Sequence, residues 1–318
     1  MISVNERAYK LIHKIEKDSE ALGLALATLP NGSKVVDAGI NVQGSLFAGK
    51  YYAEICMGGL GKVSFTSESY GDFWLPGVTV VTEQPVLACM AAQYAGWRID
   101  LGDFFAMASG PARALALVED LFTRLEYRDH SSVAVIALEG RRFPTVEVAE
   151  WIARKCRVAA NNLWLVVSPT ASLVGSVQIS ARVVETGMHK LMELGFDLKK
   201  VVSGFGTAPL APVAADDLLA IGRTNDCVLY GGKVYYTVQA ADREIEKVIE
   251  KLPSVASRDY GTPFYQVFQR YSGDFYKIDP LLFSPAEVVI NNLSTGRVFR
   301  AGQVNREVLK LSLLGGGN

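Results

Sequence analysis

The sequence has few of the residues that build metal centres or disulfide frameworks. Its four cysteines are spread along the chain: Cys56, Cys89, Cys156 and Cys227. No two of them form a CxxC pair, and each lies among apolar neighbours, which predicts buried, reduced thiols. The three histidines are His13, His130 and His189. Because they form no HxxxH or H-x-E pattern, we expect no metal held by the protein.

The sequence also lacks an excess of charge of either sign, and it lacks long apolar runs. The 32 basic residues almost balance the 33 acidic ones, so no overall field exists to attract a nucleic acid. No apolar run approaches the ~20 residues that a membrane span requires. Residues 1–22 have the pattern of a charged amphipathic helix, unlike a secretory signal. We therefore expect a soluble, cytoplasmic protein that binds neither nucleic acid nor membranes.

What the sequence does contain is a repeated alternation of strand and helix patterns. Apolar runs at 133–138 and 163–168 predict strands, and the segments 145–156 and 177–194 predict helices. Such alternation is typical of a sheet with helices packed on it. Further along, residues 226–238 ("DCVLYGGKVYYTV") predict a hairpin that turns at two glycines.

The chain length and this alternation predict an α/β protein (mixed α+β) with two α/β domains. No linker rich in proline, glycine or serine marks a boundary. We place it near residue 130, giving an N-terminal domain of residues 1–130 and a C-terminal domain of residues 131–318. Crossings of the chain between the domains are expected.

One short motif is similar to a phosphate-binding loop. "GSLFAGKY", residues 44–51, nearly matches GxxxxGK[ST]. A nucleotide-hydrolysing loop needs a hydroxyl after the lysine to hold magnesium, and Tyr51 does not replace it. A phosphate-handling nucleotidase that depends on Lys50 is therefore a minor alternative.

Four polar residues recur along the predicted helix at 177–194. Gln178, Arg182, Glu185 and His189 follow one another at spacings of four, three and four, so they share one face. Their neighbours are small or apolar, which indicates a recessed stripe. From spacing alone, Arg182 and Glu185 fit a surface ion pair contributing ~0.2–0.5 kcal/mol, and His189 fits a packing residue.

At this helix the chain resembles the methenyltetrahydromethanopterin cyclohydrolase family of one-carbon metabolism. That family is found in methanogens, related archaea and some methylotrophic bacteria, where it serves methanogenesis or formaldehyde oxidation. The resemblance covers nearly the whole chain and rests on six blocks: "AEICMGGLGKV", "ASGPARALAL", "SPTASLVGSVQISARVVETG", "GTAPLAPV", "GRTNDCVLYGGKVY" and "GDFYKIDPLLFSPAEV".

The resemblance implies a hydrolase that reversibly converts 5,10-methenyltetrahydromethanopterin into the 5-formyl compound. It also assigns catalysis to Arg182 and Glu185. A carboxylate can take a proton from the attacking water and then give it to the departing nitrogen, so Glu185 is the expected base and acid. A guanidinium nearby favours the ionised carboxylate, which is the expected part of Arg182.

The same resemblance implies two domains facing each other across a large cleft, a homotrimer, and no prosthetic group. The one-carbon carrier, tetrahydromethanopterin or a close variant, is the substrate. A pterin needs an apolar slot with a few polar partners. The candidates are Gln178, Ser176, Phe104, Phe105, Phe205 and Tyr230. A non-catalytic pterin carrier remains an alternative, since it would keep the slot but not need the charge pair.

Overall fold

The computed structural model describes residues 2–273 and 277–315, and the chain divides into two compact units. The first unit comprises Met1–Lys62 and Leu87–Gln178. The second comprises Val63–Val86 and Ile179–Asn318. The chain thus passes from one unit to the other three times.

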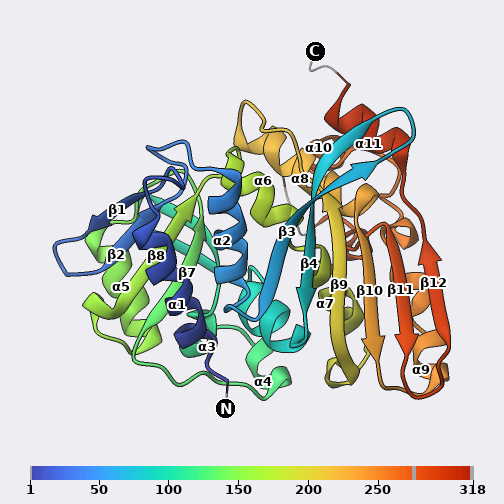
Figure 1. The fold of residues 1–318 in the computed structure, drawn as a ribbon, viewed down its shortest axis with the longest axis horizontal. Helices are drawn as coiled ribbons and strands as arrows, with labels where there is room; N and C mark the ends of the chain where they lie inside the picture. Colours follow the sequence, from blue (N-terminus) through green and yellow to red (C-terminus); the bar gives the residue numbers. More distant parts are fainter. Residues whose placement is uncertain (1, 274–276, 316–318) are drawn as a thin grey trace. The chain divides into compact units, whose positions relative to one another are not determined.

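The first unit is built on a six-stranded mixed sheet (Figure 1). In pairing order its strands are β1 (Ala25–Thr28), β2 (Lys34–Asp37), β8 (Leu163–Ser168), β7 (Ala134–Glu139), β6 (Phe104–Ser109) and β5 (Trp97–Leu101). The three strands β2, β8 and β7 run parallel, and the outer pairings are antiparallel. Its helical segments are α1 (Val4–Lys17), α2 (Leu46–Cys56), α3 (Arg113–Ala116), α4 (Leu121–Leu125), α5 (Val146–Cys156) and the 3-10 turn η2 (Ala160–Asn162). Two further segments span a boundary between the units: the π-helix η1 (Val86–Gln93) begins just before Leu87, and α6 (Leu173–Ser180) ends just after Gln178.

Both faces of this sheet are covered. Along β7, Ile136 and Leu138 pack into one core with residues of α5, whereas Val135 and Ala137 pack into another with residues of α1 and α2. A strand buried on both faces needs a continuous apolar run, because successive side chains point to opposite sides. This is why the apolar stretch at 133–138 forms a strand, as the sequence predicts.

The second unit contains another six-stranded sheet, in the order β12, β11, β10, β9, β4, β3 (Figure 1). These strands are β3 (Gly61–Ser69), β4 (Trp74–Thr82), β9 (Val201–Pro209), β10 (Lys233–Val238), β11 (Glu287–Asn292) and β12 (Val298–Gly302). Its helices are α7 (Val183–Glu193), α8 (Asp217–Gly231), α9 (Asp242–Glu246), α10 (Phe264–Arg270) and α11 (Arg306–Leu313). Short 3-10 turns are η3 (Leu198–Lys200), η4 (Ile249–Lys251), η5 (Ser254–Ala256) and η7 (Pro280–Leu282).

The two faces of this second sheet differ. Helix α7 lies against β9 at Gly204 and Gly206, where an added Cβ would come within 2.6–2.8 Å of valine side chains of α7. On the opposite face, Val81, Phe205 and Tyr235 stand in register across β4, β9 and β10. Between 36% and 46% of each of these three residues is exposed. The second unit therefore presents a sheet face that carries exposed apolar side chains.

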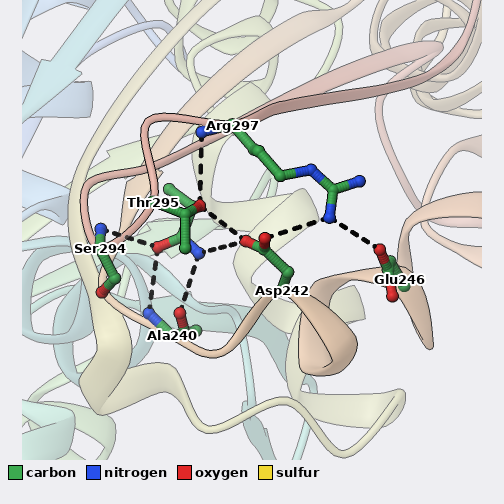
Figure 2. Close-up of polar contacts among 7 residues, drawn as sticks. Ala240, Asp242, Glu246, Ser294, Thr295 and Arg297 are labelled. Carbon is green, nitrogen blue, oxygen red and sulfur yellow. Dashed lines mark hydrogen bonds and ion pairs between the residues drawn. The ribbon is translucent and has the colours of Figure 1, made fainter.

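A polar network fastens the β11–β12 turn to the segment between β10 and α9 (Figure 2). The amide group of Asn292 accepts a hydrogen bond from the Ala240 N–H and donates to the Ala240 carbonyl and to Asp242. Asp242 also accepts from Thr295 and pairs with Arg297. The hydrogen bond from Thr295 is the main cause that lowers the pKa of Asp242. Asn292 is fully buried, so it satisfies backbone groups that water cannot reach.

The division into units differs from the boundary predicted at residue 130. Strand β7 follows that position but pairs with β6, which precedes it, so residues on both sides of 130 share one sheet. Conversely, β4 lies early in the chain but pairs with β9 of the second unit. Strand partners far apart in sequence, which local patterns do not reveal, determine the division.

The prediction of a hairpin at residues 226–238 is wrong. Helix α8 continues to Gly231, and β10 begins at Lys233 without a returning strand before it. Gly232 has a φ of −69°, and Gly231 lies so close to Pro209 that a Cβ there would be 2.8 Å from its ring. The two glycines thus allow close packing. Within the described ranges, no helix is both long and apolar enough to cross a membrane.

Candidate active site

The helix predicted at 177–194 consists of two helices with a break at Ala181 and Arg182. Helix α6 ends at Ser180 and α7 begins at Val183. The hydroxyl of Ser180 donates to the Pro209 carbonyl at 2.8 Å, and the Arg182 N–H donates to the Ile179 carbonyl at 2.9 Å. Gln178 and Glu185 therefore belong to different helices, and the single four-residue stripe is not formed on one continuous helix.

Arg182 and Glu185 do come together at the start of α7. Arg182 is the N-cap residue, and Glu185 is the third residue of the helix. Arg182 Nη1 lies 3.7 Å from Glu185 Oε2, which is an ion-pair distance. Only 13% and 8% of the two side chains are exposed. A carboxylate in the first turn also faces the positive end of the helix dipole, which favours its charged form.

The pair is recessed from solvent. Taking charged groups out of water costs on the order of several kcal/mol per ion unless their partners compensate. On the same helix, His189 and Glu193, whose Nε2 and Oε1 are 3.9 Å apart, are more open to water, with 27% and 46% of their side chains exposed. The site therefore holds a recessed carboxyl group beside a guanidinium, an arrangement suited to proton transfer.

A buried lysine anchors the far side of the same helix. Lys190 is 1% exposed, and its ammonium donates a hydrogen bond to the carbonyl of Leu281. Burial lowers the pKa of Lys190 to about 8, an effect that the negative charge of Asp279 opposes. Helix α7 is thus held to the η7 turn as well as to the sheet.

Gln178 lies at the end of the first unit's parallel strands. Its Nε2 donates to Glu139 Oε2 at 2.9 Å, and the Thr170 hydroxyl donates to Glu139 Oε1 at 2.6 Å. Glu139 is the last residue of β7 and is half-buried, while Gln178 and Thr170 are buried. Ligand sites of open α/β sheets lie at this carboxyl edge of parallel strands.

The other predicted pterin contacts lie in different surroundings. Ser176 is buried in α6, and Phe104 belongs to the core between the first sheet and α5. Tyr230 is fully buried in α8, with its hydroxyl donating to the Thr262 carbonyl at 2.7 Å. Phe105 is 50% exposed, beneath the guanidinium of Arg98.

Phe205 is separated from the charge pair within its own unit. It points from β9 to the face opposite the one that carries α7, because its neighbours Gly204 and Gly206 are the residues that contact α7. The structure thus brings Arg182 and Glu185 together and directs Phe205 to the other face of the sheet.

The phosphate-loop alternative does not fit the local structure. Helix α2 begins at Leu46 with Ser45 as its cap, so Lys50 lies inside a helix. Its ammonium is 2.8 Å from Glu54 Oε1, and Gly49 packs against Val177. A segment already wound into a helix cannot wrap a phosphate with its backbone N–H groups.

Three site features were not predicted from the sequence: Glu139, Thr170 and the break before α7. Glu139 carries a recognisable signal, a carboxylate directly after a buried strand, but Thr170 and the break before α7 carry none. Among residues 2–273 and 277–315, no group of three or more His, Cys, Asp or Glu side chains is arranged to hold a metal ion.

Fold and site together define a two-unit α/β protein with a recessed carboxyl group beside a guanidinium. Comparison with known proteins gives the family. A sequence model of the family described as "Cyclohydrolase (MCH)" matches residues 3–313. The chain belongs to this family.

Similar proteins extend over the same length. The methenyltetrahydromethanopterin cyclohydrolase of Methanocaldococcus jannaschii is 47% identical over 319 residues, covering 98% of each chain. That of Methanothermobacter thermautotrophicus is 47% identical over 317 residues, covering 98% of this chain and 99% of the relative. That of Methanococcoides burtonii is 43% identical over 311 residues, covering 97% of each.

Proposed function

We propose that this chain catalyses the reversible hydrolysis of 5,10-methenyltetrahydromethanopterin to 5-formyltetrahydromethanopterin. Membership of the cyclohydrolase family over nearly the whole chain supports the reaction. The observation that carries the mechanism is the recessed pair of Arg182 and Glu185 at the start of α7. The alternative of a non-catalytic pterin carrier gives no reason to bury such a pair.

In the proposed mechanism, Glu185 transfers the protons. The substrate carbon bridging N5 and N10 is electrophilic because both nitrogens share its positive charge. A water oxygen forms a bond to this carbon while Glu185 takes one proton of the water. Glu185 then gives that proton to N10 as the carbon–N10 bond breaks. The hydroxyl of the adduct releases its proton to solvent and becomes the formyl oxygen on N5, so one proton is produced in total.

Arg182 supports this cycle through its charge. A guanidinium 3.7 Å from the carboxylate stabilises the ionised form that can accept a proton. It also repels the cationic substrate, and that repulsion disappears as the charge is lost during attack. Because both effects act on the reacting groups, removing the guanidinium charge is expected to slow the chemical step.

The proposed pterin contacts are now unequally supported. Gln178 has the strongest support, because its amide is fixed by Glu139 at the carboxyl edge of parallel strands. Phe105 keeps an exposed aromatic face. Ser176, Phe104, Phe205 and Tyr230 remain proposals that the geometry does not strengthen.

The decisive experiment replaces Glu185 by glutamine. The amide keeps the shape but cannot accept the proton, so kcat should fall ~10²–10⁴-fold. Loss of the methenyl chromophore gives the rate after subtraction of buffer catalysis. The matched control is Glu193→Gln on the same helix, whose side chain is 46% exposed; its kcat should stay within about twofold of the wild type, as for other surface changes.

Two results would reject the proposal. Equal rates for Glu185→Gln and the wild type would remove the proton-transfer role. A wild-type protein that binds the pterin but hydrolyses it only at the solvent rate would favour the carrier.

We also propose a cytoplasmic homotrimer with no prosthetic group, in which tetrahydromethanopterin or a close variant serves as substrate. The resemblance to the family is the basis for the trimer. The exposed apolar face at Val81, Phe205 and Tyr235 supports self-association, since such a patch is a common interaction surface.

A further inference from the structure

Helix α7 packs closely on the second sheet because three residues at their contact are glycines, which have no side chain. A Cβ at Gly204 would be 2.6 Å from Val184 Cγ1, and one at Gly206 would be 2.8 Å from Val183 Cγ1. On the helix, a Cβ at Gly187 would be 2.2 Å from the hydroxyl oxygen of Tyr236. These glycines allow the backbone of α7 to meet the strands directly.

One polar contact crosses this close approach. Tyr236, on β10, is fully buried, and its hydroxyl donates to the carbonyl of Val184 at 2.7 Å. A carbonyl oxygen has two lone pairs, so it can accept this bond in addition to the bond within the helix. The bond is directional, so it opposes both sliding of α7 along the sheet and rotation about its axis.

The accepting carbonyl belongs to the peptide unit that joins Val184 to Glu185. Because that unit is planar, holding its oxygen also holds the nitrogen from which Glu185 extends. We infer that Tyr236 is a positioning residue: its hydroxyl fixes the peptide unit before Glu185 and thereby the place of the carboxylate. This inference rests on the proposed catalytic role of Glu185.

A tyrosine of the first unit provides a control. Tyr127 is also buried, and its hydroxyl also donates to a backbone carbonyl, that of Ile2, at 2.8 Å. Neither Tyr127 nor Ile2 belongs to α7 or to the proposed pterin contacts. Each tyrosine-to-phenylalanine change removes one hydrogen bond of the same kind, so the general cost should be similar.

The experiment compares Tyr236→Phe with Tyr127→Phe in the full-length protein. Misplacement of a catalytic group by a fraction of an ångström slows chemistry more than binding, so Tyr236→Phe should lower kcat roughly tenfold. Its KM should stay within about twofold of the wild type, because the pterin contacts are unchanged. Tyr127→Phe should also lower the melting temperature but leave kcat within about twofold.

A second pair of variants separates the hydroxyl bond from packing. Gly187→Ala places a methyl group where the Tyr236 hydroxyl lies, so it should lower both melting temperature and kcat. Combining it with Tyr236→Phe removes the shortest clash and should recover part of the melting temperature. The kcat of the double variant should stay low, because the bond to the Val184 carbonyl is still absent.

The outcomes distinguish this inference from the proposed function. If Glu185→Gln is inactive while Tyr236→Phe is as fast as Tyr127→Phe, the positioning role is wrong and the proposed function stands. The positioning role is also rejected if kcat recovers with the melting temperature in the double variant. If Glu185→Gln retains full turnover, the proposed mechanism fails, and the inference fails with it.

Discussion

Asp226, in the middle of α8, is a fully buried carboxyl group that joins three helices. It accepts hydrogen bonds from the backbone N–H of Phe264 at 2.8 Å and from the Ser312 hydroxyl at 2.5 Å. These partners lie at the start of α10 and near the end of α11. Burial raises the pKa of Asp226 to about 7, although both hydrogen bonds oppose the rise.

This raised pKa predicts a pH-dependent loss of stability. Between pH ~4 and ~7 the folded state keeps a proton on Asp226 that the unfolded chain has released, so stability falls as pH rises through this window. Asp226→Asn cannot ionise and should avoid the loss. Relative to the wild type, it should gain up to about 4 kcal/mol in unfolding free energy from pH 4 to 7.5.

Urea unfolding at several pH values measures the difference. Asp216→Asn is the control, because it makes the same change at the exposed N-cap of the same helix, where asparagine is an equally good cap. A constant difference between Asp226→Asn and the wild type across the window would show that Asp226 is ionised throughout.

At the scale of single residues, the sequence predicted which charged side chains pair better than it predicted which aromatic side chains are buried. It indicated that Arg182 and Glu185 lie together, because a spacing of three brings side chains to one side of a helix. It did not show that Phe104 and Tyr230 are core residues, since an aromatic side chain suits a core and a ligand slot equally well. Packing in the folded protein decides whether such a side chain lies in the core or in a ligand slot. That packing depends on strands that are far away in sequence.

Asn292 shows how one side chain can hold an element in place. Its amide bonds to both backbone groups of Ala240 and to Asp242, and so joins the end of β11 to the start of α9. Asn292→Ala leaves these buried backbone groups without partners. We expect the unfolding free energy to fall by roughly 2 kcal/mol or more.

Chemical denaturation would test this value against Arg297→Ala. Arg297 belongs to the same network, but its side chain is 55% exposed, so its ion pairs should contribute little. Equal losses in the two variants would show that the network acts through surface charge and that the buried amide adds nothing.

At the scale of elements, strands with a regular apolar pattern were predicted well. The segments 133–138 and 163–168 agree with β7 and β8, and 145–156 agrees with α5. The break between α6 and α7 was missed, because the residues around it, Ser180 to Val183, include no proline or glycine. The bond from Ser180 to Pro209 is a tertiary contact, and helix periodicity contains no information about it.

At the scale of the whole molecule, the proposed trimer gives a direct prediction. Light scattering should find a mass of about three times the 34.5 kDa of one chain, since buried apolar interfaces hold oligomers together. Phe205→Asp places a charge on the exposed sheet face and should lower the mass toward one chain. The matched surface control is Phe105→Asp, on the first unit, which should not change it.

A monomeric wild-type protein would contradict the proposed trimer. If the mass of Phe205→Asp equals that of the wild type, the subunit interface does not include this sheet face. Neither result bears on Glu185, whose test is kinetic.

The domain boundary was the least predictable feature at this scale. Val80 of β4 pairs with Gly206 of β9, and no local pattern along the chain indicated this pairing. Pairing of distant strands follows from the complete set of tertiary contacts, and a single sequence read in short windows does not contain it.

That long-range pairing has a consequence for synthesis of the chain. When β4 leaves the ribosome, the strand that completes its hydrogen bonding has yet to be translated. At ~5–20 residues per second, β4 waits on the order of ten seconds with one edge open. During that interval residues 87–178 of the first unit are still being synthesised. A nascent chain of this protein should therefore depend on chaperones until residue 209 has emerged, and a fragment ending before β9 should aggregate.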